Sequence, residues 1–234
     1  EGDVLIQTNL ADTLEKIAQN GKEEFYSGET ADKIANFFSV NGGILSLEDL
    51  KQYKLRMLKP VCGNYRYYEI CSMAPPSSGG IALIQILNIL ENVDFSKVNH
   101  NSKEYLEILI SAMDFAYRDR AKYLGDPDFF EVPQELLTSK KYAEEIYQQI
   151  IKKNFPLKAK VDILEGEETT HFSILDKWGN VVSNTYTLNT AYGSGIIPTG
   201  TGILMNNEMD DFSSKPGHPN AYGLIGSEAN KIQP

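Results

Sequence analysis

Residues 169–193, which read TTHFSILDKWGNVVSNTYTLNTAYG, decide the class of fold. β-branched and aromatic side chains dominate Thr170–Asp176 and Val181–Leu188, as is typical of strands. The glycine within Lys177–Asn180 predicts a hairpin turn between them. The sequence therefore predicts an antiparallel pair of strands that begins next to Thr169, with Ile203–Met205 as a candidate third strand.

The chain before these strands has the apolar spacing of helices. Ser46-Leu-Glu-Asp49 resembles a capping box at a helix start. Residues 154–168 lack periodicity and predict an exposed loop that separates the helical part from the strands. The expected helices run from Leu10 to a stop at Gly21, Thr30 to Asn41, Ser46 to Tyr53, Ile81 to Leu90, Ser102 to Tyr123 and Ser139 to Lys152.

The length and charge of the chain limit the classes of function that it can have. The chain has 234 residues, enough for one substantial core or for one domain and part of another. It carries 32 acidic residues against 22 lysines and arginines, so its surface repels phosphate backbones and argues against nucleic-acid binding. The longest apolar run, Ile81–Leu90, is interrupted by Gln85 and Asn88 and is too short to span a bilayer.

The two cysteines, Cys62 and Cys71, flank a predicted hairpin that turns near Arg66 and Tyr67. A two-residue turn there places the cysteines opposite each other, where their Cβ atoms are close enough for a disulfide. Two free strand cysteines are an equally good interpretation.

Familiar catalytic and metal-binding motifs do not occur in the sequence. The three histidines, His100, His171 and His218, are widely spaced, and no Gly-x-Ser-x-Gly motif is present. The glycine-rich stretch Pro75–Gly80 lacks the lysine of a nucleotide-binding loop, so its serines are interpreted as a helix cap. We therefore expect neither a metal nor a cofactor.

The junction between the polar loop and the first strand offers a different chemistry. A threonine hydroxyl is a weak nucleophile, but an N-terminal threonine can use its own α-amine as the base. The pKa of such an amine is about 7.7–8.0, close to working pH. This chemistry needs a cut between Glu168 and Thr169. Taken locally, an ordinary threonine before a strand is by far the commoner explanation of the pattern.

The longer pattern resembles a known family. Residues 169–193 resemble the start of the small subunit of γ-glutamyltransferases, also called γ-glutamyltranspeptidases or glutathione hydrolases. The segment GILMNNEMDDF at 202–212 is similar to the family's substrate-binding segment. The resemblance covers essentially the whole chain. Four shorter motifs also resemble family landmarks: PPSSGG at 75–80, YLGDPDF at 123–129, KPG at 215–217 and NAYGL at 220–224.

The resemblance implies an α+β fold, part of the four-layer αββα sandwich of the N-terminal-nucleophile hydrolases. It also implies a precursor that cuts itself between Glu168 and Thr169. Residues 1–168 are then the mostly helical C-terminal part of the large subunit. Residues 169–234 are the N-terminal part of the small subunit, with strands and substrate-binding loops.

The resemblance also implies the roles of the site residues. Thr169 is the nucleophile, and Thr187 orients it. Asn189 contacts the amino-acid end of the γ-glutamyl group, while Glu208 and Asp211 hold its α-ammonium. Many family members have glutamine at the position of Glu208. The implied substrates are glutathione and other γ-glutamyl compounds, with amino acids or peptides as acceptors.

Some expected parts of the family's site do not occur in this sequence. A Pro-Leu-Ser-Ser-Met segment and a Gly-Gly oxyanion pair follow the stretch matched here, and an arginine for the α-carboxylate precedes it. We therefore expect an incomplete and inactive piece of an active enzyme. The alternatives are a non-catalytic folding or interaction module, or a relative of poly-γ-glutamate depolymerases or cephalosporin acylases. By resemblance, we expect a periplasmic or secreted protein.

Overall fold

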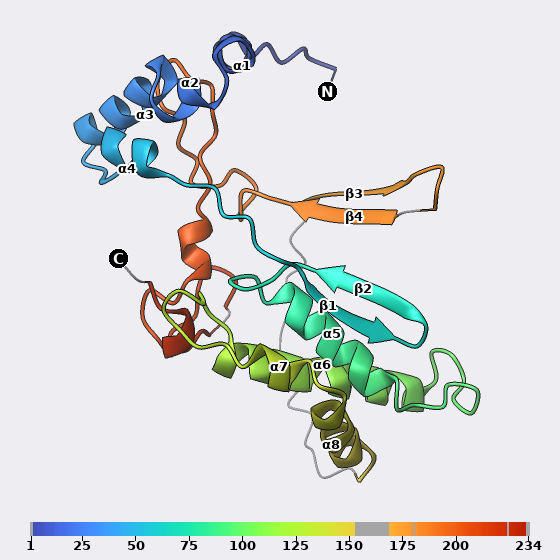
Figure 1. Cartoon of the computed structure of the whole chain (residues 1–234). Helices are drawn as coiled ribbons and strands as arrows, with labels where there is room; N and C mark the ends of the chain where they lie inside the picture. Colours follow the sequence, from blue (N-terminus) through green and yellow to red (C-terminus); the bar gives the residue numbers. More distant parts are fainter. Residues whose placement is uncertain (1, 153–168, 180, 224, 233–234) are drawn as a thin grey trace. The chain divides into compact units, whose positions relative to one another are not determined.

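A computed structural model describes residues 2–152, 169–179, 181–223 and 225–232 (Figure 1). The chain forms two compact units. Unit 1 combines Glu1–Arg56 with Leu164–Glu208, and unit 2 combines Met57–Ile163 with Met209–Pro234. Each unit therefore takes chain from both sides of the predicted cleavage point. The predicted loop at 154–168, including Glu168, lies outside the described residues.

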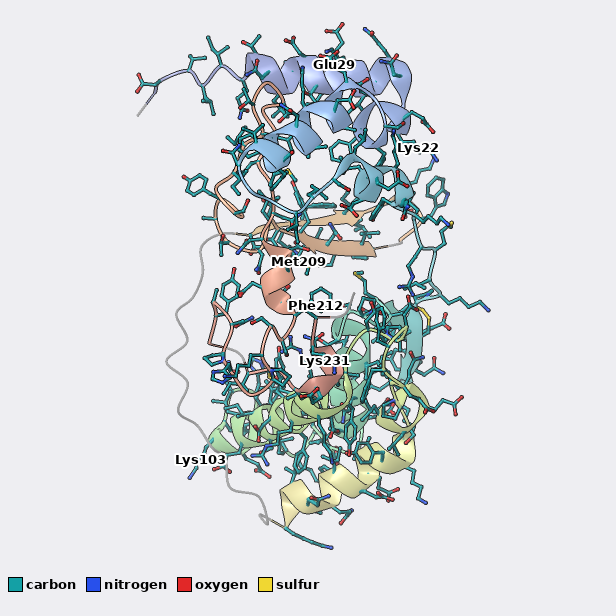
Figure 2. The ribbon with its side chains drawn as sticks, turned by 90° about the vertical axis from the view of Figure 1, so that its left-hand side faces the viewer. Lys22, Glu29, Lys103, Met209, Phe212 and Lys231 are labelled. Atoms are coloured by element: carbon teal, nitrogen blue, oxygen red, sulfur yellow. A yellow bond between two sulfur atoms is a disulfide. The ribbon has the colours of Figure 1, made fainter. Side chains whose placement is uncertain are left out.

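Unit 1 begins with four helices. These are α1 (Thr8–Asn20), α2 (Lys22–Tyr26), α3 (Glu29–Val40) and α4 (Leu47–Gln52). The predicted capping box is confirmed, because Ser46 Oγ accepts the Asp49 N–H and the Asp49 carboxylate accepts the Ser46 N–H at 2.8 Å. Glu29, which is labelled in Figure 2, forms ion pairs with Lys16 at 2.6 Å and with Lys33 at 2.8 Å. Hydrogen bonds from these two lysines lower the pKa of Glu29 to about 2.

The helices of unit 1 enclose a small apolar cluster. Ala31, Ile34 and Leu50 are its buried members, and Ile203 and Met205 pack against it. The prediction of a third strand at Ile203–Met205 is wrong, since this segment is irregular. The segment follows Gly202, whose φ of +66° interrupts an extended chain. The side chains of Ile203 and Met205 pack against the apolar cluster of the helices instead.

The predicted hairpin after Thr169 is confirmed. Strands β3 (Thr170–Leu175) and β4 (Val181–Tyr186) pair antiparallel, with Thr170 opposite Tyr186 and Ser173 opposite Ser183. Every residue of both strands is exposed.

Unit 2 is built around α5 (Gly79–Leu90). This helix contacts both strands of the β1 (Val61–Tyr65) and β2 (Tyr68–Ser72) hairpin, as well as α6 (Lys103–Tyr123) and α8 (Lys140–Ile151) (Figure 1). The close approach of hairpin and helix needs Gly63, because a Cβ there would lie 2.7 Å from Ile84 Cγ2. Three short helical segments complete the described fold: α7 (Gln134–Leu137), η1 (Glu208–Asp211) and η2 (Glu228–Asn230).

The cysteine alternatives are resolved in favour of the disulfide. Cys62 and Cys71 are paired across β1 and β2, with their Cα atoms 4.1 Å apart, and their sulfur atoms are bonded. Glu69 lies close to both sulfur atoms, but the bonded sulfurs offer no thiolate to a metal ion. Among the described helices, none is long and apolar enough to cross a membrane.

Candidate active site

The β3–β4 hairpin fixes the surroundings of Thr169. Thr169 is exposed and directly precedes β3. The register ends with Thr170 opposite Tyr186, and Thr169 and Thr187 are the residues that directly adjoin this last pair. The register is therefore compatible with Thr187 orienting Thr169, although that role stays a prediction.

Asn189 follows Thr187 in an unusual conformation. Its φ is +84°, and only 8% of the residue is exposed. Asparagine tolerates this left-handed region better than most residues because its short polar side chain bonds locally. Its N–H donates to Thr187 Oγ1 at 3.1 Å, and its Nδ2 donates to the Asn207 carbonyl at 3.2 Å. Asn189 thus links Thr187 to the segment that leads into Glu208.

The segment before Glu208 is anchored on the helices of unit 1. Thr13 Oγ1 of α1 donates to the carbonyl of Thr201 at 2.8 Å, and Thr201 is fully buried. Gly202 lies so close to α1 that a Cβ there would be 2.4 Å from the Leu10 nitrogen. The helical part of the chain therefore positions the start of the predicted substrate-binding segment.

Glu208 and Asp211 are the first and last residues of η1. Met209, within η1, and Phe212, directly after it, are labelled in Figure 2. Asn206 Oδ1 accepts the Glu208 N–H at 3.1 Å and starts the turn. Glu208 belongs to unit 1 and Asp211 to unit 2, and their joint role stays a prediction.

Burial raises the pKa of the Asp211 carboxyl above its usual 3.8. The neighbouring charge of Asp210 raises the Asp211 pKa further, and Arg120 opposes the shift. The Asp210 carboxylate is itself engaged, since it accepts the Ala221 N–H at 2.8 Å. A cationic partner would therefore stabilise the ionised form of Asp211.

Asp211 also lines a polar cavity of unit 2, with a volume of about 100 Å³. Arg120 and Ser78 lie in the same wall, and Arg120 Nε donates to Ser78 Oγ at 2.9 Å. Ser78 was predicted among the serines that cap α5, but its hydroxyl makes no cap bond. Ser77 Oγ accepts the Gly79 N–H at 3.2 Å in a local turn that precedes the helix, so the predicted side-chain cap is not formed.

The sequence and the fold identify the family. The family model described as Gamma-glutamyltranspeptidase matches residues 1–234. The chain is 51% identical to the glutathione hydrolase proenzyme of Escherichia coli (strain K12), over 100% of this chain and 41% of that protein. It is 37% identical to the glutathione hydrolase proenzyme of Bacillus subtilis (strain 168), with the same two shares covered. The chain therefore belongs to the γ-glutamyltranspeptidase family, and it spans about 41% of the length of these relatives.

Solved structures confirm the α+β fold class. The chain is similar to γ-glutamyltranspeptidase from Helicobacter pylori, with 46% identity and a TM-score of 0.62 over 64% of this chain and 43% of that chain. It is also similar to cephalosporin acylase from Bacillus halodurans, with 30% identity and a TM-score of 0.76 over 100% of this chain and 41% of that chain. The fold is thus shared by transpeptidases and an acylase.

Proposed function

We propose that the protein containing this chain transfers and hydrolyses γ-glutamyl groups, and that Thr169 is its nucleophile. The position of Thr169 is the observation that carries this proposal, since Thr169 directly precedes β3 and adjoins the last pair of the hairpin register, Thr170 with Tyr186. Family membership adds support, because the related proteins are named glutathione hydrolase proenzymes. We expect the precursor to cut itself before Thr169 and to form a large and a small subunit.

The proposed reaction has two steps. The Thr169 hydroxyl attacks the γ-carbonyl carbon, and its proton passes to the Thr169 α-amine. The amide C–N bond then breaks, the departing amine takes that proton, and a γ-glutamyl ester remains on Thr169. In the second step water or an amino-acid amine attacks the ester carbonyl carbon and gives a proton to the Thr169 α-amine. The ester C–O bond then breaks, the Thr169 oxygen takes that proton, and glutamate or a new γ-glutamyl amide is released. Hydrolysis and transfer therefore share one intermediate.

Substrate recognition is assigned to Asn189, Glu208 and Asp211. An α-ammonium group needs hydrogen-bond acceptors, and ionised acceptors make the stronger bonds. Glu208 and Asp211, the first and last residues of η1, each supply a carboxylate. We expect glutathione and other γ-glutamyl compounds as donors, with amino acids or short peptides as acceptors.

A periplasmic or secreted location is part of this proposal. The Cys62–Cys71 disulfide supports it, because disulfides persist mainly in oxidising compartments.

The proposal is tested by a paired assay on the full-length protein. γ-Glutamyl-p-nitroanilide should release p-nitroaniline, faster when glycylglycine is present as acceptor. Thr169→Ala should abolish release, whereas Thr170→Ala, which changes the neighbouring threonine, should retain it. Release that is undiminished in Thr169→Ala would rule out the proposed nucleophile.

An acylase activity is the second candidate, because the match to the cephalosporin acylase covers the whole chain. A matched pair of substrates separates the two functions. Glutaryl-p-nitroanilide differs from the γ-glutamyl compound only in lacking the α-amino group. Because Glu208 and Asp211 are both present in η1, we expect faster release from the γ-glutamyl compound. Faster release from the glutaryl compound would favour the acylase.

A further inference from the structure

We infer that Asn207 is a positioning residue that holds Asn189 in the conformation needed for substrate binding. This inference rests on the proposed function, in which Asn189 contacts the γ-glutamyl group. Asn207 was not singled out by sequence reasoning, and its role follows from the bonds that it makes.

Asn189 needs an external support. Its φ of +84° lies in the left-handed region, which is unfavourable for residues other than glycine. Such a conformation persists only where surrounding contacts fix it. The support must also be specific, because rotation at Asn189 would redirect both its own amide and the chain that follows Thr187.

Asn207 supplies this support from both its backbone and its side chain. Its N–H donates to the Leu188 carbonyl at 3.1 Å, and its carbonyl accepts Asn189 Nδ2 at 3.2 Å. Its Oδ1 accepts the Thr190 N–H at 3.1 Å and lies 3.2 Å from the Thr190 hydroxyl. Asn207 therefore bonds to the residue before Asn189, to Asn189 itself and to the residue after it.

The neighbouring Asn206 shows that this role belongs to Asn207 specifically. Asn206 is exposed, and its Oδ1 accepts the N–H of Glu208 at the start of η1. Asn207 is half-buried, and its Oδ1 is directed to Thr190. Within this pair, one side chain begins the acidic turn and the other fixes the turn that holds Asn189.

The test measures KM for γ-glutamyl-p-nitroanilide in the full-length protein, because KM does not depend on how much enzyme is folded. Asn207→Ala removes the acceptor for Thr190 and should raise KM about five- to tenfold, the usual scale for one or two lost hydrogen bonds. Asn207→Asp keeps an oxygen at the same place and should restore most of the affinity. Asn41→Ala is the control, since Asn41 is exposed, directly follows α3 and donates from its side chain to the Phe37 carbonyl of that helix.

A double variant distinguishes positioning from an independent effect. Asn189→Gly keeps the left-handed backbone accessible but removes the amide. If Asn207 acts through Asn189, then adding Asn207→Ala to Asn189→Gly should raise KM no further. The inference would be overturned if the fold increases in KM of the two single variants multiplied in the double variant. It would also be overturned if the KM of Asn207→Ala equalled that of the wild type.

A crystal structure of Asn207→Ala provides a readout that does not depend on activity. The inference predicts that Asn189 leaves the left-handed region, and an unchanged Asn189 backbone would contradict it. Lack of γ-glutamyl activity in the wild type would instead count against the proposed function, so the two failures can be told apart.

Discussion

Asp211 combines a cost in stability with its proposed role in binding the substrate ammonium. Burial and the adjacent Asp210 disfavour its ionised form, whereas Arg120 favours it. Since its folded-state pKa is raised, Asp211 contributes stability below its ordinary pKa of 3.8 that is lost as pH rises through the raised value. At neutral pH the ionised carboxylate therefore destabilises the fold, and an ammonium ligand offsets that cost.

We predict that Asp211→Asn separates these two effects. The variant should be more stable than the wild type at pH 7, because the amide carries no charge to desolvate. Its KM for a γ-glutamyl donor should rise roughly tenfold to a hundredfold, since a hydrogen bond to a charged group is worth about 1.5–3 kcal/mol. Thermal unfolding and steady-state kinetics measure the two changes. A variant that is less stable and binds donor normally would contradict this account of Asp211.

At the scale of elements, a buried polar contact joins three helices of unit 2. Asp119 on α6 accepts Gln85 Nε2 of α5 at 2.6 Å and the Tyr142 hydroxyl of α8 at 3.0 Å. Gln85 and Asp119 are both buried. Burial and the charge of Asp119 raise the pKa of Tyr142, so its hydroxyl stays protonated as a donor.

We predict that Asp119→Ala destabilises the protein more than Tyr142→Phe does. Asp119→Ala leaves two donors without their acceptor and should cost about 2–4 kcal/mol, whereas Tyr142→Phe removes one bond and should cost about 1 kcal/mol. Denaturant unfolding of both variants checks the order. Equal losses would mean that Asp119 contributes little beyond its bond to Tyr142.

The β1–β2 hairpin carries the second prediction at this scale. The cysteines are nine residues apart, so their disulfide closes a short loop. Replacing both with serine should lower the free energy of unfolding by about 2–3 kcal/mol, as chain entropy predicts for a loop of this length. The unreduced wild type should show no reactive thiol after unfolding, and labelling of two thiols would contradict the disulfide.

The sequence predicted the regular elements better than their connections. The long helices and both hairpins follow from apolar spacing and turn residues, but α2 and α7 span only five and four residues, too short to produce a periodic pattern. Ser78 was expected to cap α5, yet it bonds to Arg120 on α6, a contact that local sequence cannot reveal. Thr169 and Thr187 were assigned by resemblance, and both adjoin the last pair of the β3–β4 register, Thr170 with Tyr186. The role of Asn207 required three-dimensional contacts with residues 188–190.

At the scale of the whole molecule, the central feature is how the chain crosses the predicted cleavage point. Each compact unit contains chain from before and after that point, so a cut before Thr169 would leave both units built from two polypeptides. Subunits formed in this way would stay associated through contacts that exist before the cut, such as the Thr13–Thr201 hydrogen bond within unit 1. The helical part would thereby keep positioning the strand part after processing.

Intact mass spectrometry of the full-length protein, with Thr169→Ala and Thr170→Ala beside the wild type, tests the central claim most directly. The account predicts two chains in the wild type, the smaller beginning at Thr169, a single chain in Thr169→Ala, and two chains again in Thr170→Ala. A wild type that stays whole, or a Thr169→Ala variant that still splits between residues 168 and 169, would contradict it.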